Sequence, residues 1–190
     1  AIQDERQNAT VRQTLERRRA ELERDPNAPV LGNPQGDITM IEFFDYNCPY
    51  CKRAMEPVKG LLAGDGGIRL VYREFPILSD GSVFAAKAAL AARNQGKYEE
   101  MHWALMSLGR ADEASTIKTA EGLGLDIDRL RADMDSPEVA SHIALSMDLA
   151  GGLGITGTPS FVIGDTVVPG LVPLEKLVEL VETQRRAMEQ

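Results

Sequence analysis

Residues 43–53 read Phe-Phe-Asp-Tyr-Asn-Cys-Pro-Tyr-Cys-Lys-Arg. The apolar residues at the start of this stretch complete a run that predicts a buried strand, and a helix is expected to begin near Pro49. A C-x-x-C motif between a strand and a helix places both sulfur atoms in the first helical turn, close enough to form a small disulfide ring. We therefore expect Cys48 and Cys51 to form a dithiol that switches between reduced and oxidised forms.

The two cysteines are expected to have different roles. Cys48 would lie at or just before the helix start, where unpaired N–H groups and the positive end of the helix dipole stabilise a thiolate and lower its pKa. Pro49 suits the first helical position because its ring fixes φ and its missing N–H would have no partner there. Cys51 lies one turn further and should be more enclosed. This pattern predicts Cys48 as the attacking thiol and Cys51 as the resolving thiol.

Two other interpretations of the C-x-x-C motif compete with a redox role. A zinc site needs two further soft ligands, but the two histidines, His102 and His142, are about forty residues apart, far more than the spacing of a typical zinc motif. A structural disulfide would close a loop of only four residues, which constrains the unfolded chain very little. The sequence therefore favours a redox dithiol and predicts neither a metal site nor a cofactor, and we assign the histidines no role.

The composition predicts a soluble globular protein with one main domain. The chain has 190 residues, of which 43% are apolar and 26% are charged. Its formal net charge of −8 argues against nucleic acid or an anionic membrane as a general partner. The sequence contains no run of about eighteen apolar residues, so no membrane span is predicted. Residues 1–5 lack the basic start and apolar middle of a signal peptide, so we expect any leader to have been removed.

The first part of the chain predicts a charged helix. Residues 4–24 contain no Gly or Pro and combine many helix formers with dense mixed charge. Val11, Leu15 and Leu22 form a thin apolar seam, which Arg18 interrupts. Such a seam fits either a short coiled coil with a second copy of the chain or a helix that lies on its own domain.

Two strands are predicted on either side of a helix over residues 49–63. Turn-forming residues dominate 25–29 and 31–37, and residues 38–44 are β-branched, aromatic and almost continuously apolar, as in a central strand. Residues 68–75 alternate and predict a second strand. Strand, helix and strand form a βαβ unit, so the two strands are expected to be parallel with a right-handed crossover.

Glu42 is the exception in the first predicted strand. Burying a carboxylate costs free energy because burial disfavours the ionised form. Glu42 lies six residues before Cys48, so one interpretation is a proton acceptor beneath the dithiol that takes the proton from Cys51. The other interpretation is a glutamate at a strand edge that faces water.

The rest of the chain predicts a helical block, a hairpin and a closing helix. The pattern is helical from about residue 82 to residue 149. Thr158 and Pro159 then precede an apolar strand, where a cis peptide bond would accommodate the proline. A tight turn at residues 164–165 predicts a hairpin, and residues 174–188 predict an amphipathic helix.

Three pieces of the chain together carry a resemblance to a known family. They are residues 30–34, Val-Leu-Gly-Asn-Pro; residues 42–51, from Glu42 to the second cysteine; and residues 154–159, Gly-Ile-Thr-Gly-Thr-Pro. With these pieces in this order, the chain resembles the DsbA-type branch of the thioredoxin-fold oxidoreductases, and within it the Com1-like and ScsC-like bacterial proteins. The match covers roughly residue 29 to the C-terminus.

The resemblance implies an α/β thioredoxin fold with an inserted helical domain and an N-terminal helical extension. Residues 1–28 would form the charged helix and its linker. Residues 29–80 and 150–190 would form the thioredoxin-like domain, and residues 81–149 the inserted helical domain.

The resemblance also implies roles for individual residues. Cys48 would be the nucleophile, Cys51 the resolving thiol and Glu42 the buried carboxylate. Thr158 and Pro159 would form a cis-proline loop that faces the dithiol and holds an extended substrate segment by backbone hydrogen bonds.

The same resemblance implies an exported, periplasmic protein. Its partners would be cysteine-containing exported proteins and a redox partner protein that resets the dithiol. Pro49 and Tyr50 would contact substrate together with the cis-proline loop. Residues 4–24 would assemble homo-oligomers.

The sequence thus supports two classes of function. The first is a thiol-disulfide oxidoreductase that exchanges a Cys48–Cys51 disulfide with cysteines of exported proteins through a mixed disulfide, as an oxidase or as an isomerase or reductase. The direction of electron flow stays open. The second is a non-redox interaction module that uses the N-terminal helix on a thioredoxin-like scaffold.

Overall fold

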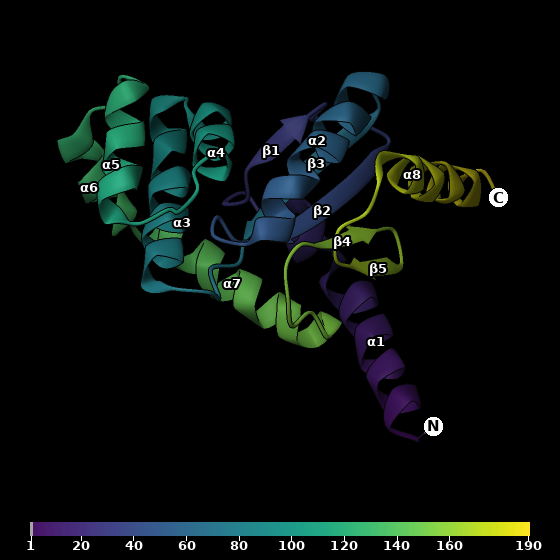
Figure 1. Cartoon of the computed structure of the whole chain (residues 1–190). Coiled ribbons are helices and arrows are strands. Elements are labelled where there is room, and N and C mark those ends of the chain that lie inside the picture. The colour runs from purple at the N-terminus through teal and green to yellow at the C-terminus, as the bar shows by residue number, and fades with distance from the viewer. Residues whose placement is uncertain (1) are drawn as a thin grey trace.

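The computed structural model describes residues 2–190, and Figure 1 shows how their helices and strands are arranged. In chain order the elements are α1 (Ile2–Arg24), β1 (Val30–Gly32), β2 (Ile38–Phe44), α2 (Pro49–Gly64), β3 (Ile68–Glu74), α3 (Asp80–Ala92), a short 3₁₀ helix (Arg93–Gln95), α4 (Tyr98–Met106), α5 (Glu113–Gly122), α6 (Ile127–Met134), α7 (Pro137–Leu153), β4 (Ser160–Ile163), β5 (Thr166–Pro169) and α8 (Leu174–Met188). Within residues 2–190, no helix is both long enough and apolar enough to cross a membrane.

Five strands form one mixed sheet in the order β1-β3-β2-β4-β5. β2 and β3 are parallel, from the pair Ile38–Ile68 to the pair Phe44–Glu74, and α2 connects them, so the predicted parallel βαβ unit is confirmed. β4 pairs antiparallel with both β2 and β5. β2 therefore has a neighbour on each side, and the interpretation of Glu42 as a residue at a strand edge is wrong.

The short strand β1 was not predicted. Residues 31–37 predict turns, but Val30–Gly32 pair antiparallel with β3. The strand has only three residues, and its partner lies about forty residues further along the chain, so no local pattern reveals it. Gly32 has a φ of 73°, and a Cβ there would lie 2.6 Å from the carbonyl oxygen of Ile68, so only glycine fits.

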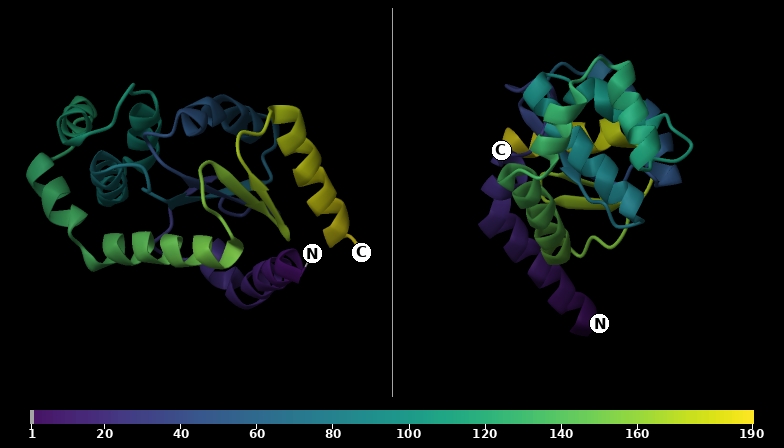
Figure 2. Two further views of the ribbon diagram at one scale, coloured as in Figure 1. Left: turned by 60° about the horizontal axis from the view of Figure 1, so that its bottom comes forward. Right: turned by 90° about the vertical axis from the view of Figure 1, so that its left-hand side faces the viewer.

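Helices cover both faces of the sheet, as Figure 2 shows. α2 and α8 pack against the face that carries Met40 and Phe44, whereas α1 and α7 pack against the face that carries Ile41 and Phe43. Side chains alternate along a strand, so Glu42 belongs to the face that α2 covers. That placement puts its carboxyl under the helix that begins with the dithiol.

The predicted helical block contains α3 to α7, and the structure shifts some of its boundaries. α5 begins at Glu113 because Asp112 caps the helix and Ser115 completes a capping box as its third residue. Trp103 in α4 is only partly buried. The Nζ atom of Lys59 lies 4.7 Å from the centroid of its ring.

α1 lies on its own domain over its second half, while its first turns extend beyond the rest of the molecule (Figure 1). Leu15 and Leu22 are buried in one core with residues of α7. Arg18, which interrupts the seam, has non-helical backbone angles and pairs with Asp148 at 2.6 Å. The apolar seam is therefore occupied within the chain, and association with a second copy would have to use other residues of α1.

A buried ion pair joins the segment after α1 to the sheet. The guanidinium of Arg73 in β3 donates to Asp25 Oδ2 at 2.5 Å, to Ser146 Oγ at 3.0 Å and to the carbonyl oxygen of His142 at 2.9 Å. The Arg73 side chain has no exposed surface. Its partners come from the linker and from α7, so this one side chain holds three parts of the fold together.

We expect Asp25→Ala to lower the free energy of unfolding by about 3 kcal/mol, because the guanidinium of Arg73 would stay buried without its counter-ion. Urea unfolding followed by circular dichroism measures this change. The control is Glu179→Ala, which removes an exposed ion pair with Lys176 and should change the free energy of unfolding by less than about 0.5 kcal/mol. Equally small effects of the two substitutions would contradict the role given to the buried pair.

Candidate active site

Cys48 and Cys51 lie at the start of α2, as predicted. Cys48 immediately precedes the helix, with φ −79° and ψ 117°, and Pro49 occupies the first helical position. Both thiols are unbridged, and both residues are largely buried, with 5% of Cys48 and 1% of Cys51 exposed. In its thiol form, Cys48 donates a hydrogen bond from Sγ to the carbonyl oxygen of Thr158 at 3.2 Å. The structure therefore brings the dithiol and the Thr158–Pro159 loop together.

The Thr158–Pro159 loop lies at the end of the central strand. The peptide bond between the two residues is cis. Ser160, the next residue, begins β4 and pairs with Phe43 in β2. This pairing anchors the loop beside the position where β2 leads into the dithiol.

The turn before the dithiol is held by Asp45. Its buried carboxylate accepts hydrogen bonds from the backbone N–H groups of Asn47 at 2.8 Å, Ile77 at 2.9 Å and Leu78 at 3.0 Å, and from Ser82 Oγ at 2.7 Å. These donors come from the turn itself and from the segment that leads into α3. Sequence reasoning gave Asp45 no role, although an aspartate at the end of an apolar strand is a signal for a turn held by a side chain.

The two thiols have opposite pKa shifts. The pKa of Cys48 is lowered to about 5, chiefly because the Cys51 thiol donates a hydrogen bond to its sulfur, while burial opposes this shift. The Thr158 side chain and the backbone N–H groups of Tyr50 and Cys51 lower it further. The pKa of Cys51 is raised, chiefly by burial, then by its hydrogen bond with Cys48 and by the negative charge of Glu42. At neutral pH, Cys48 is therefore a thiolate and Cys51 a thiol.

Glu42 lies on the α2 face of β2. Its side chain is buried, and its neighbours in the sheet are Tyr72 in β3 and Phe161 in β4. The pKa of Glu42 is raised to about 8, chiefly by burial and also by the negative charge of Cys48, while a hydrogen bond with Tyr72 opposes the shift. Because this pKa is close to neutral pH, the carboxyl can both release and take up a proton there.

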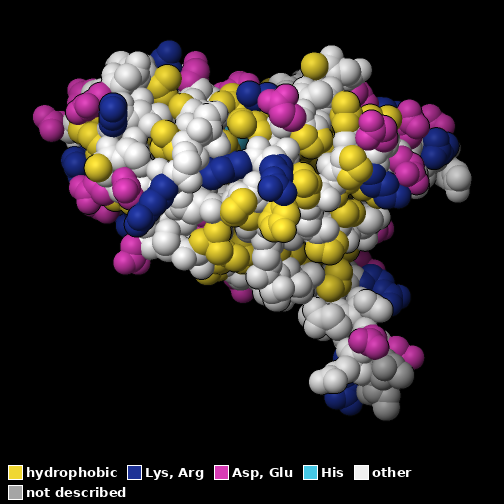
Figure 3. Space-filling model, in the orientation of Figure 1, with side chains coloured by type: hydrophobic (Ala, Val, Ile, Leu, Met, Phe, Trp, Pro, Cys, Tyr) yellow, Lys and Arg dark blue, Asp and Glu magenta, His cyan; other side chains and the backbone are white. Residues whose placement is uncertain are grey.

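Exposed apolar side chains flank the dithiol. Tyr50 is 55% exposed, and the guanidinium carbon of Arg53 lies 5.6 Å from the centroid of its ring. Ile77 and Leu78, which are 37% and 52% exposed, are tied to the turn through Asp45. Figure 3 shows hydrophobic side chains gathered over the start of α2 and the β4–β5 hairpin, with basic side chains beside them. Sequence reasoning missed Ile77 and Leu78, because an apolar pair after a strand resembles ordinary core.

Both histidines are buried. Burial lowers the pKa of His102 to about 3, and its Nδ1 atom lies 3.0 Å from the hydroxyl of Tyr46. The Nε2 atom of His142 accepts a hydrogen bond from the backbone N–H of Glu74 at 3.0 Å. Within residues 2–190, no group of three or more His, Cys, Asp or Glu side chains is placed to hold a metal ion.

Comparison with known proteins identifies relatives with the same fold. The model of the DSBA-like thioredoxin domain matches residues 39–182. A solved structure of a thioredoxin-like oxidoreductase from Silicibacter pomeroyi DSS-3 is 57% identical, with a TM-score of 0.87 over 88% of this chain and 98% of that chain. The thiol-disulfide exchange protein α-DsbA2 from Wolbachia pipientis is 29% identical, with a TM-score of 0.84 over 94% of this chain and 97% of that chain. The catalytic domain of ScsC from Proteus mirabilis is 27% identical, with a TM-score of 0.84 over 91% of this chain and 97% of that chain.

The curated relatives that the sequence matches include Na⁺/H⁺ antiporters. NhaA 3 from Salinispora tropica is 36% identical over 137 residues, which is 70% of this chain and 21% of the antiporter. The chain spans only 21% to 26% of the length of antiporters from Salinispora tropica, Salinispora arenicola and Herminiimonas arsenicoxydans.

The family model covers the dithiol, Glu42 and the Thr158–Pro159 loop, and the solved structures named above share the mixed α/β, thioredoxin-like architecture of the chain. The resemblance inferred from three short motifs is therefore confirmed. This chain belongs to the family of DSBA-like thioredoxin domains.

Proposed function

We propose that this protein is a thiol-disulfide oxidoreductase that exchanges a Cys48–Cys51 disulfide with the cysteines of other proteins, and that it acts as an oxidant. The observation that carries the proposal is a pair of thiols in one helical turn with opposite pKa shifts, to about 5 for Cys48 and upward for Cys51. Membership of the DSBA-like family supports the oxidoreductase class.

The first step of the proposed reaction opens the disulfide. A substrate thiolate attacks Cys48 Sγ, a new sulfur–sulfur bond forms, and the bond between Cys48 and Cys51 breaks with its electron pair on Cys51. The pKa of Cys51 is raised, so its thiolate must take up a proton at once. Glu42, whose pKa of about 8 leaves it largely protonated at neutral pH, is the proposed donor.

The second step releases the oxidised substrate. A second thiolate of the substrate attacks the substrate sulfur in the mixed disulfide, and Cys48 leaves as a thiolate. The substrate has then lost two electrons and gained a disulfide, while Cys48 and Cys51 are reduced. In the reverse reaction, Cys51 attacks a mixed disulfide and passes its proton to the Glu42 carboxylate.

The low pKa of Cys48 favours the oxidising direction. At pH 7, ionisation of a thiol with a pKa of about 5 stabilises the reduced protein about 10²-fold relative to a thiol with the usual pKa of about 8.5. This stabilises the reduced protein and makes the disulfide a stronger oxidant by about 60 mV, since a tenfold change in the equilibrium constant corresponds to about 30 mV. The alternative is that the protein reduces or isomerises substrate disulfides, and refolding assays distinguish it from the oxidising direction.

The surface around the dithiol suits an extended, unfolded substrate segment. The Thr158–Pro159 loop would pair with the substrate backbone, as in strand addition to a sheet. Pro49 and the exposed Tyr50 would contact side chains of the substrate, and we add the exposed Leu78 to this set. Apolar contacts of this kind favour chains that have not yet buried their hydrophobic residues.

The proposal extends to the cellular setting. Protein disulfides persist in oxidising compartments, so we propose the periplasm as the site of action and cysteine-containing exported proteins as substrates. A redox partner protein would then reoxidise the dithiol. Residues 29–80 and 150–190 would carry the reaction, and residues 81–149 would act as an inserted helical domain. Self-association through residues 4–24 stays a prediction.

Alkylation of Cys48 tests the redox assignment. The rate with iodoacetamide should rise through a midpoint near pH 5 and stay flat from about pH 6 to pH 8, because the thiolate is then fully formed. Cys51→Ala should move the midpoint upward, since it removes the hydrogen bond that lowers the pKa of Cys48 most. A wild-type midpoint near 8.5, the ordinary thiol value, would instead favour a non-redox interaction module.

Substitution of Glu42 tests the proposed proton transfer. Glu42→Gln should slow the attack of Cys51 on a mixed disulfide by about 10²-fold, the lower end of what a positioned acid or base contributes. Stopped-flow release of a fluorescent thiol from a mixed disulfide at Cys48 measures this rate. Glu56→Gln on the exposed side of α2 is the matched control and should leave the rate unchanged. Equal rates in wild type and Glu42→Gln would remove Glu42 from the mechanism.

The same Glu42→Gln substitution predicts a change in the pH dependence of stability. The folded pKa of Glu42 is raised from 4.5 to about 8, so its stabilising contribution is complete below pH 4.5 and is lost as the pH rises through 8. In the reduced protein, unfolding free energy at pH 9 relative to pH 6 should therefore fall more in wild type than in Glu42→Gln. Parallel curves for the two proteins would show that Glu42 does not carry the raised pKa.

Refolding assays decide the direction. We expect the oxidised protein to form disulfides in a reduced, unfolded substrate, and its reduction potential against glutathione to lie above that of thioredoxin, about −270 mV. The reduced protein should not rescue a substrate with scrambled disulfides. Rescue of a scrambled substrate, together with a potential near that of thioredoxin, would assign the isomerase or reductase direction.

A further inference from the structure

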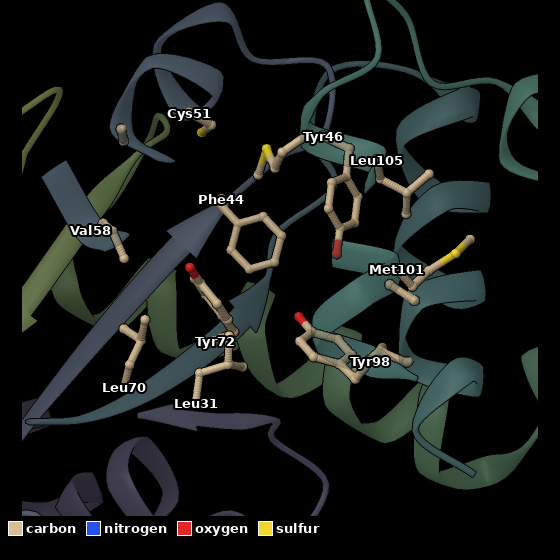
Figure 4. Close-up of a cluster of buried hydrophobic side chains, with 14 of the residues drawn as sticks. Leu31, Phe44, Tyr46, Cys51, Val58, Leu70, Tyr72, Tyr98, Met101 and Leu105 are labelled. Atoms are coloured by element: carbon tan, nitrogen blue, oxygen red, sulfur yellow. The ribbon is translucent and has the colours of Figure 1, made fainter. Parts of the chain in front are cut away.

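A second buried carboxyl lies on the α2 face of the sheet, at the end of β3, and the proposed reaction does not use it. Glu74 Oε1 accepts a hydrogen bond from the hydroxyl of Tyr46 at 2.9 Å and another from the hydroxyl of Tyr98 at 2.9 Å. All three side chains are buried. Figure 4 shows the hydroxyl groups of Tyr46 and Tyr98 directed into the same space between the sheet and α4.

The orientation of this cluster follows from its donors and acceptors. The Tyr46 hydroxyl gives its proton to Glu74, so the contact of 3.0 Å with His102 Nδ1 requires the histidine nitrogen to donate. The ring of His102 stacks on that of Tyr72 with centroids 4.2 Å apart. Burial lowers the pKa of His102 to about 3, so the ring is neutral and its one proton lies on Nδ1. The chain of hydrogen bonds then runs from His102 through Tyr46 to Glu74.

Burying Glu74 destabilises the fold, so a contribution to stability does not explain its presence. Its Oε2 atom is buried and has no hydrogen-bond partner in the part of the chain that the structure describes. A buried polar atom without a partner destabilises the folded state, and an apolar side chain of similar size would avoid that cost. The pKa of Glu74 is raised well above its usual value, chiefly by burial.

Tyr46 connects this cluster to the turn between β2 and α2, residues 45–48, which we call the redox turn. It lies two residues before Cys48, and its backbone oxygen accepts a hydrogen bond from Lys52 Nζ at 2.6 Å. Its two neighbours in sequence are also fixed, Asp45 by the contacts described above and Asn47 by a pair of hydrogen bonds with the backbone of Ala111. The Tyr46 side chain is thus the only link from this turn to Glu74 among the hydrogen bonds of the described residues.

We propose that Glu74 is a positioning residue of the redox site, which fixes Tyr46 and through it the turn that presents Cys48 to the N–H groups at the start of α2. This inference rests on the proposed function. Glu74 does not touch the sulfur atoms or the substrate. It acts by keeping the hydrogen bonds that stabilise the Cys48 thiolate at their best geometry.

Four substitutions test the inference. Tyr46→Phe and Glu74→Leu remove the link and should raise the pKa of Cys48, weakening the thiolate about fivefold, as expected when one hydrogen bond is impaired. Glu74→Gln keeps an acceptor oxygen for both tyrosines and should preserve the wild-type pKa. Tyr98→Phe removes the other hydroxyl from the same oxygen without touching the turn, so it should lower thermal stability but leave the pKa of Cys48 unchanged.

The pKa of Cys48 is read from thiolate absorbance at 240 nm during a pH titration, and the equilibrium constant with glutathione should fall by the same factor. If Glu74→Leu does not fold, Tyr46→Phe carries the test alone. An unchanged pKa in Tyr46→Phe, or an equal shift in Tyr98→Phe, overturns the inference. The wild-type protein distinguishes failure of the proposed function from failure of this inference. An ordinary thiol titration of wild-type Cys48 refutes the proposed function. A wild-type pKa near 5 that the substitutions do not change refutes only the role of Glu74.

Discussion

The proposed redox chemistry depends on holding one sulfur atom, that of Cys48, as a thiolate at the start of α2. The Cys51 thiol and backbone N–H groups of the first helical turn supply the hydrogen bonds that stabilise it. A thiolate so placed needs a rigid support, because its stability depends on the positions of several donors at once. The parallel pair β2 and β3 provides that support, and the turn after β2 is fixed by the carboxylate of Asp45.

The two faces of the sheet bury different ionisable groups. The face that α2 covers buries two carboxyls, Glu42 and Glu74, both with raised pKa values. The opposite face buries the guanidinium of Arg73 with its counter-ion Asp25. Because Arg73 and Glu74 are adjacent in β3, their side chains point to opposite faces. The strand therefore separates a permanent positive charge from a carboxyl whose pKa burial raises.

Local patterns in the sequence predict the parts of this structure that depend on neighbours in the chain. The C-x-x-C motif, the strand around Glu42, the parallel βαβ unit and the helical block all follow from short-range periodicity and capping residues. Features that depend on distant partners were missed. β1 has three residues and pairs with β3, and the cluster of Glu74 joins residues of β3, α4 and the redox turn. From the sequence, the apolar seam of α1 could pack either on a second copy of the chain or on its own domain. The tertiary contacts show that its own domain covers Leu15 and Leu22.

Trp103, the single tryptophan of the chain, lies close to the turn that leads into the dithiol. Its ring centroid lies 4.7 Å from that of His102, which is hydrogen-bonded to Tyr46 two residues before the first cysteine, and its outer face is covered by Lys59. The indole thus lies between the buried imidazole of His102 and the ammonium group of Lys59, and His102 links it to the turn that leads into Cys48. Its fluorescence is therefore the signal in which to look for a difference between the reduced and oxidised forms of the unlabelled protein.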